Sequence, residues 1–350
     1  MKNKTLLLTF VLILFSAVLY AQPQKKINFT DSLGRKQGYW KKIVNDTLKY
    51  EGTFKDNNPD GEFKYYYPDK SVKALTIYSN DGKKAKTVMF YNNGKKNAEG
   101  SYVDKQKDGL WVYYNKDQVK MSEENYQNGL KSGVWKYYYD NSKINKIENY
   151  KNNMLDGECL EYYPDSLIKM KSNYKAGKRQ GLIQFYDLNG KVFASGNYLN
   201  DLQEGVWMFF NDKGAAERRL TFKAGNLLNE ELVLASKSGN KYINIKDIAF
   251  CEKKDSSVFI RLNSGEQILV PYTLTDLERI LGEVSYFRIN ANFIISIWSL
   301  KNRKTFSQDN PVLTLNPDPG IPVLIDKAEI EGFMSWAGLI KYDKDKEKDK

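Results

Sequence analysis

The residue types that most enzymes and metal sites require are scarce in this sequence. Its 350 residues include no histidine and two cysteines, Cys159 and Cys251. This composition excludes a Ser-His-Asp triad, a Cys-His pair and every histidine-ligated zinc or haem site, and two cysteines cannot form a four-cysteine metal site. The chemistry that remains is catalysis by paired carboxylates, calcium binding by carboxylates, or no chemistry at all.

Two short motifs deserve a test against that background. Residues 56–61 match the first half of a calcium loop, but Tyr67 stands where the bidentate glutamate belongs. Asp, Asn, Pro and Gly also form turns, so we interpret this segment as a turn. Ser166 and Lys169 form an S-x-x-K pair without a partner motif, and no pair of converging acids of the glycosidase kind stands out. We expect no enzyme activity, no catalytic or metal-binding residue and no cofactor.

The N-terminus has the pattern of an export signal. Lys2 and Lys4 precede a largely apolar run over residues 6–20, and Ala21 precedes the polar chain. The run is short for a membrane span, which needs about 20 residues. We predict that residues 1–21 are a signal peptide and that the mature chain, beginning at Gln22, is periplasmic or secreted. An uncleaved anchor is the alternative; after cleavage, any membrane association would not be integral.

A 24-residue repeat organises the first two thirds of the mature chain. Most repeats begin at a glycine, as at Gly109 and Gly133, and Ala85 fills one grid point. Two residues later comes a column that we expect to be structural, with aromatic members Trp40, Phe63, Trp111, Trp135 and Trp207. Five residues after the grid point comes a second column, which we interpret as repeat-surface aromatics: Tyr66, Phe90, Tyr114, Tyr138, Tyr162, Tyr186 and Phe210. A third aromatic column comprises Phe54, Tyr78, Tyr102, Tyr126, Tyr150, Tyr174, Tyr198 and Phe222.

Each repeat has the pattern of a β-hairpin. Residues 134–139 and 144–150 alternate as two strands around the turn at 140–142. Asn-Gly and Pro-Asp pairs stand at the same place in other repeats and supply the turn conformations. Stacked hairpins predict a single-layer antiparallel sheet with aromatic side chains on both faces. Cys159 takes a place in the structural column, so we expect a small buried hydrophobe; a disulfide to Cys251 would have to bridge two domains.

The columns resemble the MORN repeat in its bacterial variant. The clearest copy joins residues 111–114 with residues 125–129, and the resemblance covers residues 38–229. It implies a scaffold or binding surface without catalysis. Some bacterial proteins of this kind are similar to antitoxin-like and immunity proteins, which bind other proteins.

The pattern changes after residue 236. Short apolar strands precede a helix near residues 273–281, with Thr273 or Thr275 as its N-cap, and two further strand segments follow. This order resembles the LytTR domain, a mostly β DNA-binding fold, over about residues 240–338. The family's H-R-S is Asn290-Ala291-Asn292 here, its following Asn is Ser296, and its S-R is Leu324-Ile325.

These departures weaken the implied DNA contacts while the apolar frame is kept. Lysine plus arginine equal aspartate plus glutamate over residues 236–340, whereas DNA binding depends on cations that neutralise phosphates. If the domain does bind DNA, the candidate contacts are Arg288, Asn290, Asn292, Lys301, Arg303 and Lys304.

The sequence therefore predicts a mainly β chain with four parts. These are the signal peptide, a MORN-like domain at residues 22–235, a LytTR-like domain with one or two short helices at 236–340, and a disordered charged tail at 341–350. The favoured function is an exported, non-enzymatic scaffold that binds a protein or cell-envelope partner through its aromatic and basic sheet. A LytTR-type DNA-binding regulator is the alternative, and an antitoxin-like or immunity-like protein is the second.

Overall fold

The computed structural model describes residues 26–236, 239–301 and 311–338, and these residues are mainly β, as predicted. The predicted signal peptide and charged tail lie outside the described residues. The chain divides into two compact units, residues 1–118 and 119–350. The predicted domain boundary at 235/236 is a boundary of sequence pattern and stays a prediction.

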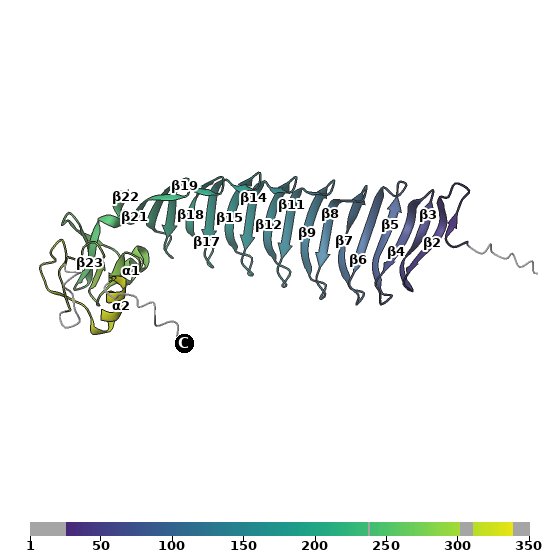
Figure 1. The fold of residues 1–350 in the computed structure, drawn as a ribbon. Coiled ribbons are helices and arrows are strands. Elements are labelled where there is room, and N and C mark those ends of the chain that lie inside the picture. Colours follow the sequence, from purple (N-terminus) through teal and green to yellow (C-terminus); the bar gives the residue numbers. More distant parts are fainter. Residues whose placement is uncertain (1–25, 237–238, 302–310, 339–350) are drawn as a thin grey trace, which may run out of the picture. The chain divides into compact units, whose positions relative to one another are not determined.

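The first unit is an antiparallel ladder in which each strand pairs with the next along the chain (Figure 1). Its strands are β1 (Phe29–Thr30), β2 (Lys36–Val44), β3 (Thr47–Lys55), β4 (Asn58–Tyr66), β5 (Val72–Ser79), β6 (Lys84–Phe90), β7 (Lys96–Val103) and β8 (Gln106–Tyr114).

The second unit begins with an antiparallel ladder of the same kind. Its repeat strands are β9 (Lys120–Gln127), β10 (Leu130–Lys131), β11 (Gly133–Tyr138), β12 (Ile144–Lys151), β13 (Met154–Leu155), β14 (Gly157–Tyr162), β15 (Ile168–Lys175), β16 (Lys178–Arg179), β17 (Gly181–Tyr186), β18 (Val192–Leu199), β19 (Leu202–Phe210), β20 (Ala216–Lys223), β21 (Asn226–Ser236) and β22 (Gly239–Asn244). The antiparallel repeat sheet predicted from the 24-residue pattern is thus confirmed within each unit.

The grid glycines are needed for their backbone conformation. Gly109 and Gly133 have φ of +73° and +72°, a region that residues with a Cβ rarely adopt. Ala85 occupies the same grid point without a positive φ, and the pairing of β5 with β6 keeps a continuous register there, whereas β3–β4 and β7–β8 shift register. The repeat that contains Ala85 is therefore locally different from its neighbours.

The C-terminal part of the second unit holds a five-stranded antiparallel sheet in the order β25-β24-β23-β27-β26. The elements of this C-terminal part, in chain order, are η1 (Ile245–Asp247), β23 (Ile248–Lys254), β24 (Ser257–Leu262), β25 (Gln267–Val270), α1 (Leu274–Leu281), β26 (Tyr286–Arg288), β27 (Phe293–Ser296), β28 (Val312–Leu313), β29 (Val323–Leu324), η2 (Lys327–Glu329) and α2 (Ile330–Trp336). Thr273 caps α1 and forms a capping box with Asp276, which resolves the predicted choice of N-cap.

The strand β21 extends beyond the end of the repeat pattern at residue 229. Leu232 and Leu234 are buried and belong to the same core cluster as Leu277 of α1. The hydroxyl of Tyr272 donates to the carbonyl of Val233 at 2.6 Å. The last repeat hairpin thus shares a core with the five-stranded sheet.

Among the described residues, no helix has the length and apolar character to cross a membrane.

Candidate interaction surfaces

Three aromatic residues of the structural column pack directly against glycines of the neighbouring strand. Trp111 is 1% exposed, and a Cβ added at Gly100 would lie 2.3 Å from its indole ring. Phe63 on Gly52 and Trp207 on Gly196 repeat this arrangement, with clashes of 2.4 and 2.1 Å for an added Cβ. A glycine eleven residues before the aromatic residue therefore makes room for it. Trp135 is also buried, while Trp40, in the first full hairpin, is half-buried.

Hydrogen bonds and lysines complete the setting of this column. The indole N–H of Trp135 donates to the carbonyl of Asn125 at 2.8 Å, and that of Trp111 donates to the carbonyl of Ser101 at 3.0 Å. The ammonium groups of Lys131 and Lys107 lie 4.2 and 4.7 Å from the ring centroids of Trp135 and Trp111. Such cation–π contacts are stabilising. We call the side of the sheet that carries the structural column and the third aromatic column the aromatic face.

The predicted repeat-surface aromatics lie on the other side of the sheet and are all half-buried. Tyr66 donates its hydroxyl to Glu51 at 2.6 Å, whereas its neighbour Tyr65 bonds the hydroxyl of Tyr78 at 2.8 Å. Tyr114 likewise donates to Glu99 at 2.8 Å. We call this second side the charged face, because its tyrosines surround carboxylates. The two faces therefore both carry aromatic side chains.

Lysines join these tyrosine–carboxylate pairs on the charged face. Lys96 lies 2.9 Å from Glu99, and Lys120 lies 2.5 Å from Glu123. The hydroxyl groups of Tyr39 and Tyr66, in that order of importance, lower the pKa of Glu51 to about 2. Burial, followed by the bond to Glu51, raises the pKa of Tyr66 to about 12. At neutral pH the carboxylate is thus ionised and the phenol is protonated.

A further tyrosine column was not predicted from the sequence. These tyrosines stand six residues after the grid point and bond a backbone carbonyl 23 residues ahead, in the next repeat. Tyr67 donates to Phe90, Tyr91 to Tyr114, Tyr139 to Tyr162 and Tyr163 to Tyr186, at distances of 2.6 to 2.8 Å. The acceptor in each pair is a predicted surface aromatic. The spacing of these four tyrosines in multiples of 24 residues, with Asn115 at the one intervening position, was the signal that could have revealed this column.

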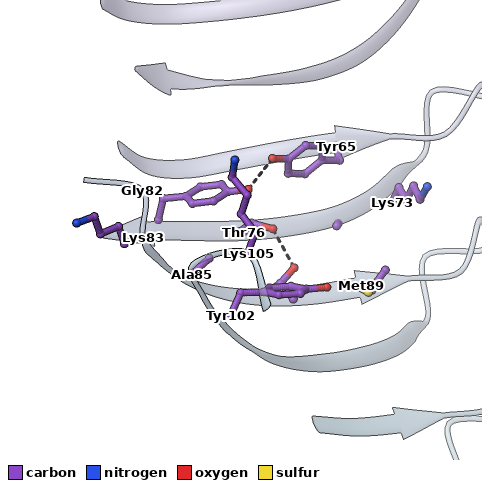
Figure 2. Close-up of a pocket in the computed structure, with 12 residues that line it drawn as sticks. Tyr65, Lys73, Thr76, Gly82, Lys83, Ala85, Met89, Tyr102 and Lys105 are labelled. Atoms are coloured by element: carbon purple, nitrogen blue, oxygen red, sulfur yellow. Dashed lines mark hydrogen bonds between the residues drawn. The ribbon is translucent and has the colours of Figure 1, made fainter. Parts of the chain in front are cut away.

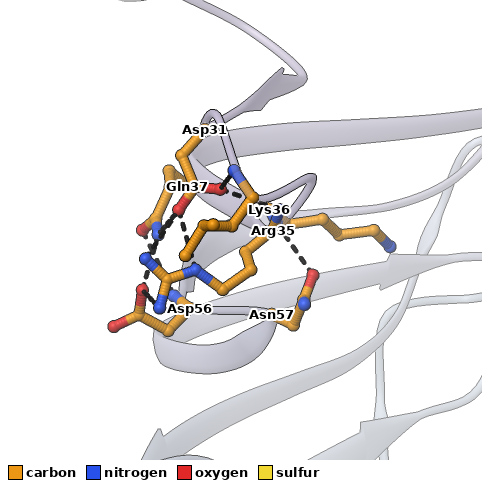
Figure 3. Close-up of polar contacts among 7 residues, drawn as sticks. Asp31, Arg35, Lys36, Gln37, Asp56 and Asn57 are labelled. Atoms are coloured by element: carbon orange, nitrogen blue, oxygen red, sulfur yellow. Dashed lines mark hydrogen bonds and ion pairs between the residues drawn. The ribbon is translucent and has the colours of Figure 1, made fainter.

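The motif that resembles half a calcium loop is a link between hairpins (Figure 3). Asp56 forms an ion pair with Arg35 at 2.8 Å and accepts the amide of Gln37 at 2.7 Å. Asn57 accepts the backbone N–H of Lys36 at 2.8 Å. The same kind of bond joins Lys131 to Asn153. The interpretation as a turn holds for Asp56 and Asn57, whereas residues 58–61 belong to strand β4. The described residues contain no cluster of three or more acidic or cysteine ligands suited to a metal.

One repeat of the first unit breaks the structural column and leaves a hollow (Figure 2). Thr87 stands at the place that Phe63 and Trp111 occupy in the neighbouring repeats. Its hydroxyl bonds that of Thr76 across the strands at 2.8 Å. The hollow has a volume of about 340 Å³ and is lined by Tyr65, Lys73, Ala74, Thr76, Tyr78, Gly82, Lys83, Ala85, Thr87, Met89, Tyr102 and Lys105.

The two cysteines are buried and unbonded. Burial raises the pKa of both thiols, that of Cys251 most strongly. Cys159 has the buried position in the structural column that was expected of it, and the structure contains no disulfide between these two residues.

The candidate DNA contacts of the C-terminal part are partly engaged within the domain. Arg288 forms an ion pair with Glu278 at 3.0 Å, and Asn290 donates its amide to the carbonyl of Leu324 at 2.6 Å. Asn292 and Lys301 are exposed. Arg303 and Lys304 lie outside the described residues.

Two of the positions at which the sequence departs from the family pattern, Ser296 and Ile325, are buried. Ser296 is fully buried and donates its hydroxyl to the carbonyl of Ala249 at 2.7 Å. Ile325 is buried, whereas Leu324 is half exposed. Neither aliphatic side chain can donate a hydrogen bond to a phosphate or a base edge.

Comparison with known families assigns both parts of the chain. Residues 238–336 match the model of the LytTr DNA-binding domain, and residues 59–80, 131–152 and 179–200 match the MORN repeat variant. The chain contains MORN-variant repeats and a C-terminal LytTR domain. Both expected resemblances are thereby confirmed. No curated protein matches the chain.

Solved structures add only distant similarities. The LytTr DNA-binding domain of a Bacillus cereus protein described as a methyl-accepting/DNA response regulator is 17% identical; the match covers 31% of this chain and 96% of that one, with a TM-score of 0.26. TarM is 13% identical over 34% of this chain and 20% of its own, with a TM-score of 0.17. A mutant TarM of S. aureus is 12% identical over 34% and 19%, with a TM-score of 0.18.

Proposed function

We propose that this chain is an exported, non-enzymatic binding protein that holds a protein or cell-envelope partner on its MORN-variant sheet. The observation that carries this proposal is that the aromatic columns differ in exposure. Trp111 and Trp135 are buried by packing, whereas tyrosines and lysines recur at the same 24-residue spacing with part of their surface open to solvent. Tyrosine and other large amphipathic side chains favour protein interfaces.

The proposal of export has its support in the sequence. The basic residues Lys2 and Lys4, the apolar run 6–20 and Ala21 follow the order of a secretory signal. Fractionation of cells that produce the full-length chain, followed by intact-mass measurement, tests this part. We expect an envelope or secreted form that begins at Gln22. A full-length cytosolic product would contradict export and favour the DNA-binding alternative.

Partner binding needs a second experiment with a matched control. The mature chain should capture a partner from envelope extract, and the double variant Tyr138→Ala, Tyr162→Ala should capture at least tenfold less. Leu269→Ala changes an exposed residue of the LytTR domain and should leave capture unchanged. Equal capture by the tyrosine variant would show that the charged face does not bind the partner. An antitoxin-like or immunity-like role would be favoured if the captured partner is a toxin.

The alternative function, DNA binding by the LytTR domain, is favoured by the family match over residues 238–336. Asn292 and Lys301 are exposed and could approach a duplex. Ser296 and Asn290 instead donate hydrogen bonds to backbone carbonyls within the domain. A regulator would need replacement contacts elsewhere in the domain. Enrichment of one DNA motif from a random library, with binding that weakens steeply as salt rises, would establish this alternative.

A further inference from the structure

The hollow in the first unit arises because small side chains replace the structural column there. Ala74, Ala85 and Ala98 are buried, and Thr87 takes the place of a large aromatic residue. In the repeats on either side, Phe63 and Trp111 fill the corresponding space. The missing volume is therefore set by small side chains on the paired strands β5 and β6, which belong to neighbouring repeats (Figure 2).

The walls of the hollow are tyrosines held in place by the neighbouring repeats. Tyr78 packs edge-on against Phe63, with ring centroids 5.1 Å apart, and Tyr102 packs edge-on against Trp111 at 4.9 Å. Tyr65 is tied to Tyr78 through their hydroxyl groups. These contacts fix the walls before any ligand arrives, which lowers the entropic cost of binding.

The floor offers apolar contact and few free polar groups. The hydroxyls of Thr76 and Thr87 bond one another, so their methyl groups and those of Ala74 and Ala85 define the surface. A sugar ring would bring hydroxyl groups that lack partners on this floor, at a cost in desolvation. An aromatic or branched aliphatic side chain would meet no such penalty.

Three exposed lysines complete the site. In Figure 2, Lys83 and Lys73 lie toward opposite ends of the hollow, and Lys105 also lines it. A ligand that places acidic groups on both sides of an apolar anchor would match this distribution of charge. An extended peptide does so naturally, because its residues advance by about 3.3 Å along the chain.

We propose that this hollow binds an apolar side chain flanked by acidic residues on a partner protein. The proposal rests on the proposed binding function and names a further contact with the partner, on the aromatic face and separate from the charged-face tyrosines. Because the hollow lies on a sheet face, it can receive a protruding side chain while the rest of the partner stays outside.

The test uses the mature chain and a fluorescein-labelled acidic peptide with a central tryptophan. Fluorescence polarisation should show saturable binding that weakens as salt rises. Replacing the central tryptophan of the peptide by alanine should weaken binding at least tenfold. Equal binding of the two peptides, or no binding of either, would overturn the proposal.

A filled hollow provides the decisive variant. The double substitution Thr76→Gly, Thr87→Trp recreates the glycine–aromatic pair seen at Gly100 and Trp111, so the sheet should keep its thermal unfolding transition. Peptide binding should fall at least tenfold. Should that variant fail to fold, Ala85→Leu, which fills the hollow more modestly, serves the same comparison. Unchanged peptide affinity in a folded, filled variant would refute the site.

Charge reversal separates the rim from the rest of the surface. Lys83→Glu with Lys105→Glu should weaken peptide binding at least tenfold, whereas Lys86→Glu should not. Lys86 is the matched control because it is exposed and lies on the same strand as Thr87, one residue away, and so points to the opposite face. Equal effects of the two reversals would show general electrostatic attraction and overturn the proposal.

Two further probes keep competing ligands and the wider function apart. Binding of a neutral oligosaccharide or of anionic phospholipid vesicles that disappears in the filled variant, without peptide binding, would assign the hollow to another ligand and overturn the peptide proposal. If envelope extract yields a partner equally with the wild type and the filled variant, the proposed function stands and the hollow proposal fails. If the peptide binds as expected but no partner is captured, the hollow proposal stands and the proposed function fails.

Discussion

The MORN-variant repeats and the LytTR domain distribute their characteristic residues in opposite ways. In the repeats, the aromatic residues that define the sequence pattern also form the packing contacts, as Trp111 does against Gly100. In the LytTR domain, the buried frame that includes Ile289 and Phe293 is intact, while the positions expected to contact DNA are altered or turned inward. A family pattern can therefore persist through packing alone, and it does not guarantee the family's binding chemistry.

The largest effect should come from removing one aromatic residue of the structural column. Trp135→Ala should lower the free energy of unfolding by about 3–5 kcal/mol, because it removes a buried side chain and leaves a cavity. Denaturant unfolding of the chain from Gln22 onward measures this loss. Val134→Ala, next to it on the opposite face and 41% exposed, should change stability by less than about 0.5 kcal/mol. A loss below about 1 kcal/mol at Trp135 would mean that the column is not a packing element.

The next effect concerns the glycine beneath a column residue. Gly100→Ala should destabilise the first unit by about 1–3 kcal/mol, because its new Cβ would collide with the Trp111 ring. In a Trp111→Leu background the same substitution should cost less, since the smaller side chain can move aside. Additive effects of the two substitutions would contradict direct contact between these residues.

A smaller, pH-dependent effect should come from the charged face. The hydroxyl groups of Tyr39 and Tyr66 lower the folded-state pKa of Glu51 to about 2, from the ordinary glutamate value of 4.5. Its contribution is therefore fully present above about pH 4.5 and is lost as pH falls toward 2. Glu51→Gln should reduce stability at pH 7, and the difference from wild type should shrink across that window. Parallel stability curves for the two proteins would refute this assignment.

The smallest expected effect is on DNA. The mature chain should give no shift of random-sequence duplex below the micromolar range, and selection from a random library should enrich no motif. Balanced charge over residues 236–340 predicts weak counterion release, so any residual binding should depend only shallowly on salt. A reproducible motif with a steep salt dependence would erase the contrast between the two regions and assign contacts to residues such as Lys301.

The repeats were predictable because the same residue types recur at the same spacing in many successive repeats. The hairpins, their turns and the buried state of Cys159 all follow from spacing and residue type. For α1 the sequence left two N-cap candidates, Thr273 and Thr275, and the structure selects Thr273. The C-terminal strands could also be placed, since alternating apolar runs are short and bounded by turn residues. These features depend on local pattern, which a single sequence contains.

Features that depend on cross-strand neighbours were not predictable in the same way. The glycine at position 100 looks like any strand glycine until Trp111 is placed over it. The hollow at Thr87 needs the neighbouring columns to be filled, and the continuation of β21 into the LytTR core needs both partners in space. Which surface tyrosines are tied to carboxylates is likewise a matter of register between strands.

The tyrosines that bond the next repeat also determine how this protein could change in size. Tyr139 and Tyr163 each reach one repeat ahead, to Tyr162 and Tyr186, and the link has the same form at both places. Deleting or duplicating a whole 24-residue block would restore an equivalent donor and acceptor at the new junction. Because adjacent strands are about 4.8 Å apart and each repeat adds one hairpin, gene-level gain or loss of a repeat would alter the sheet in steps of roughly 10 Å.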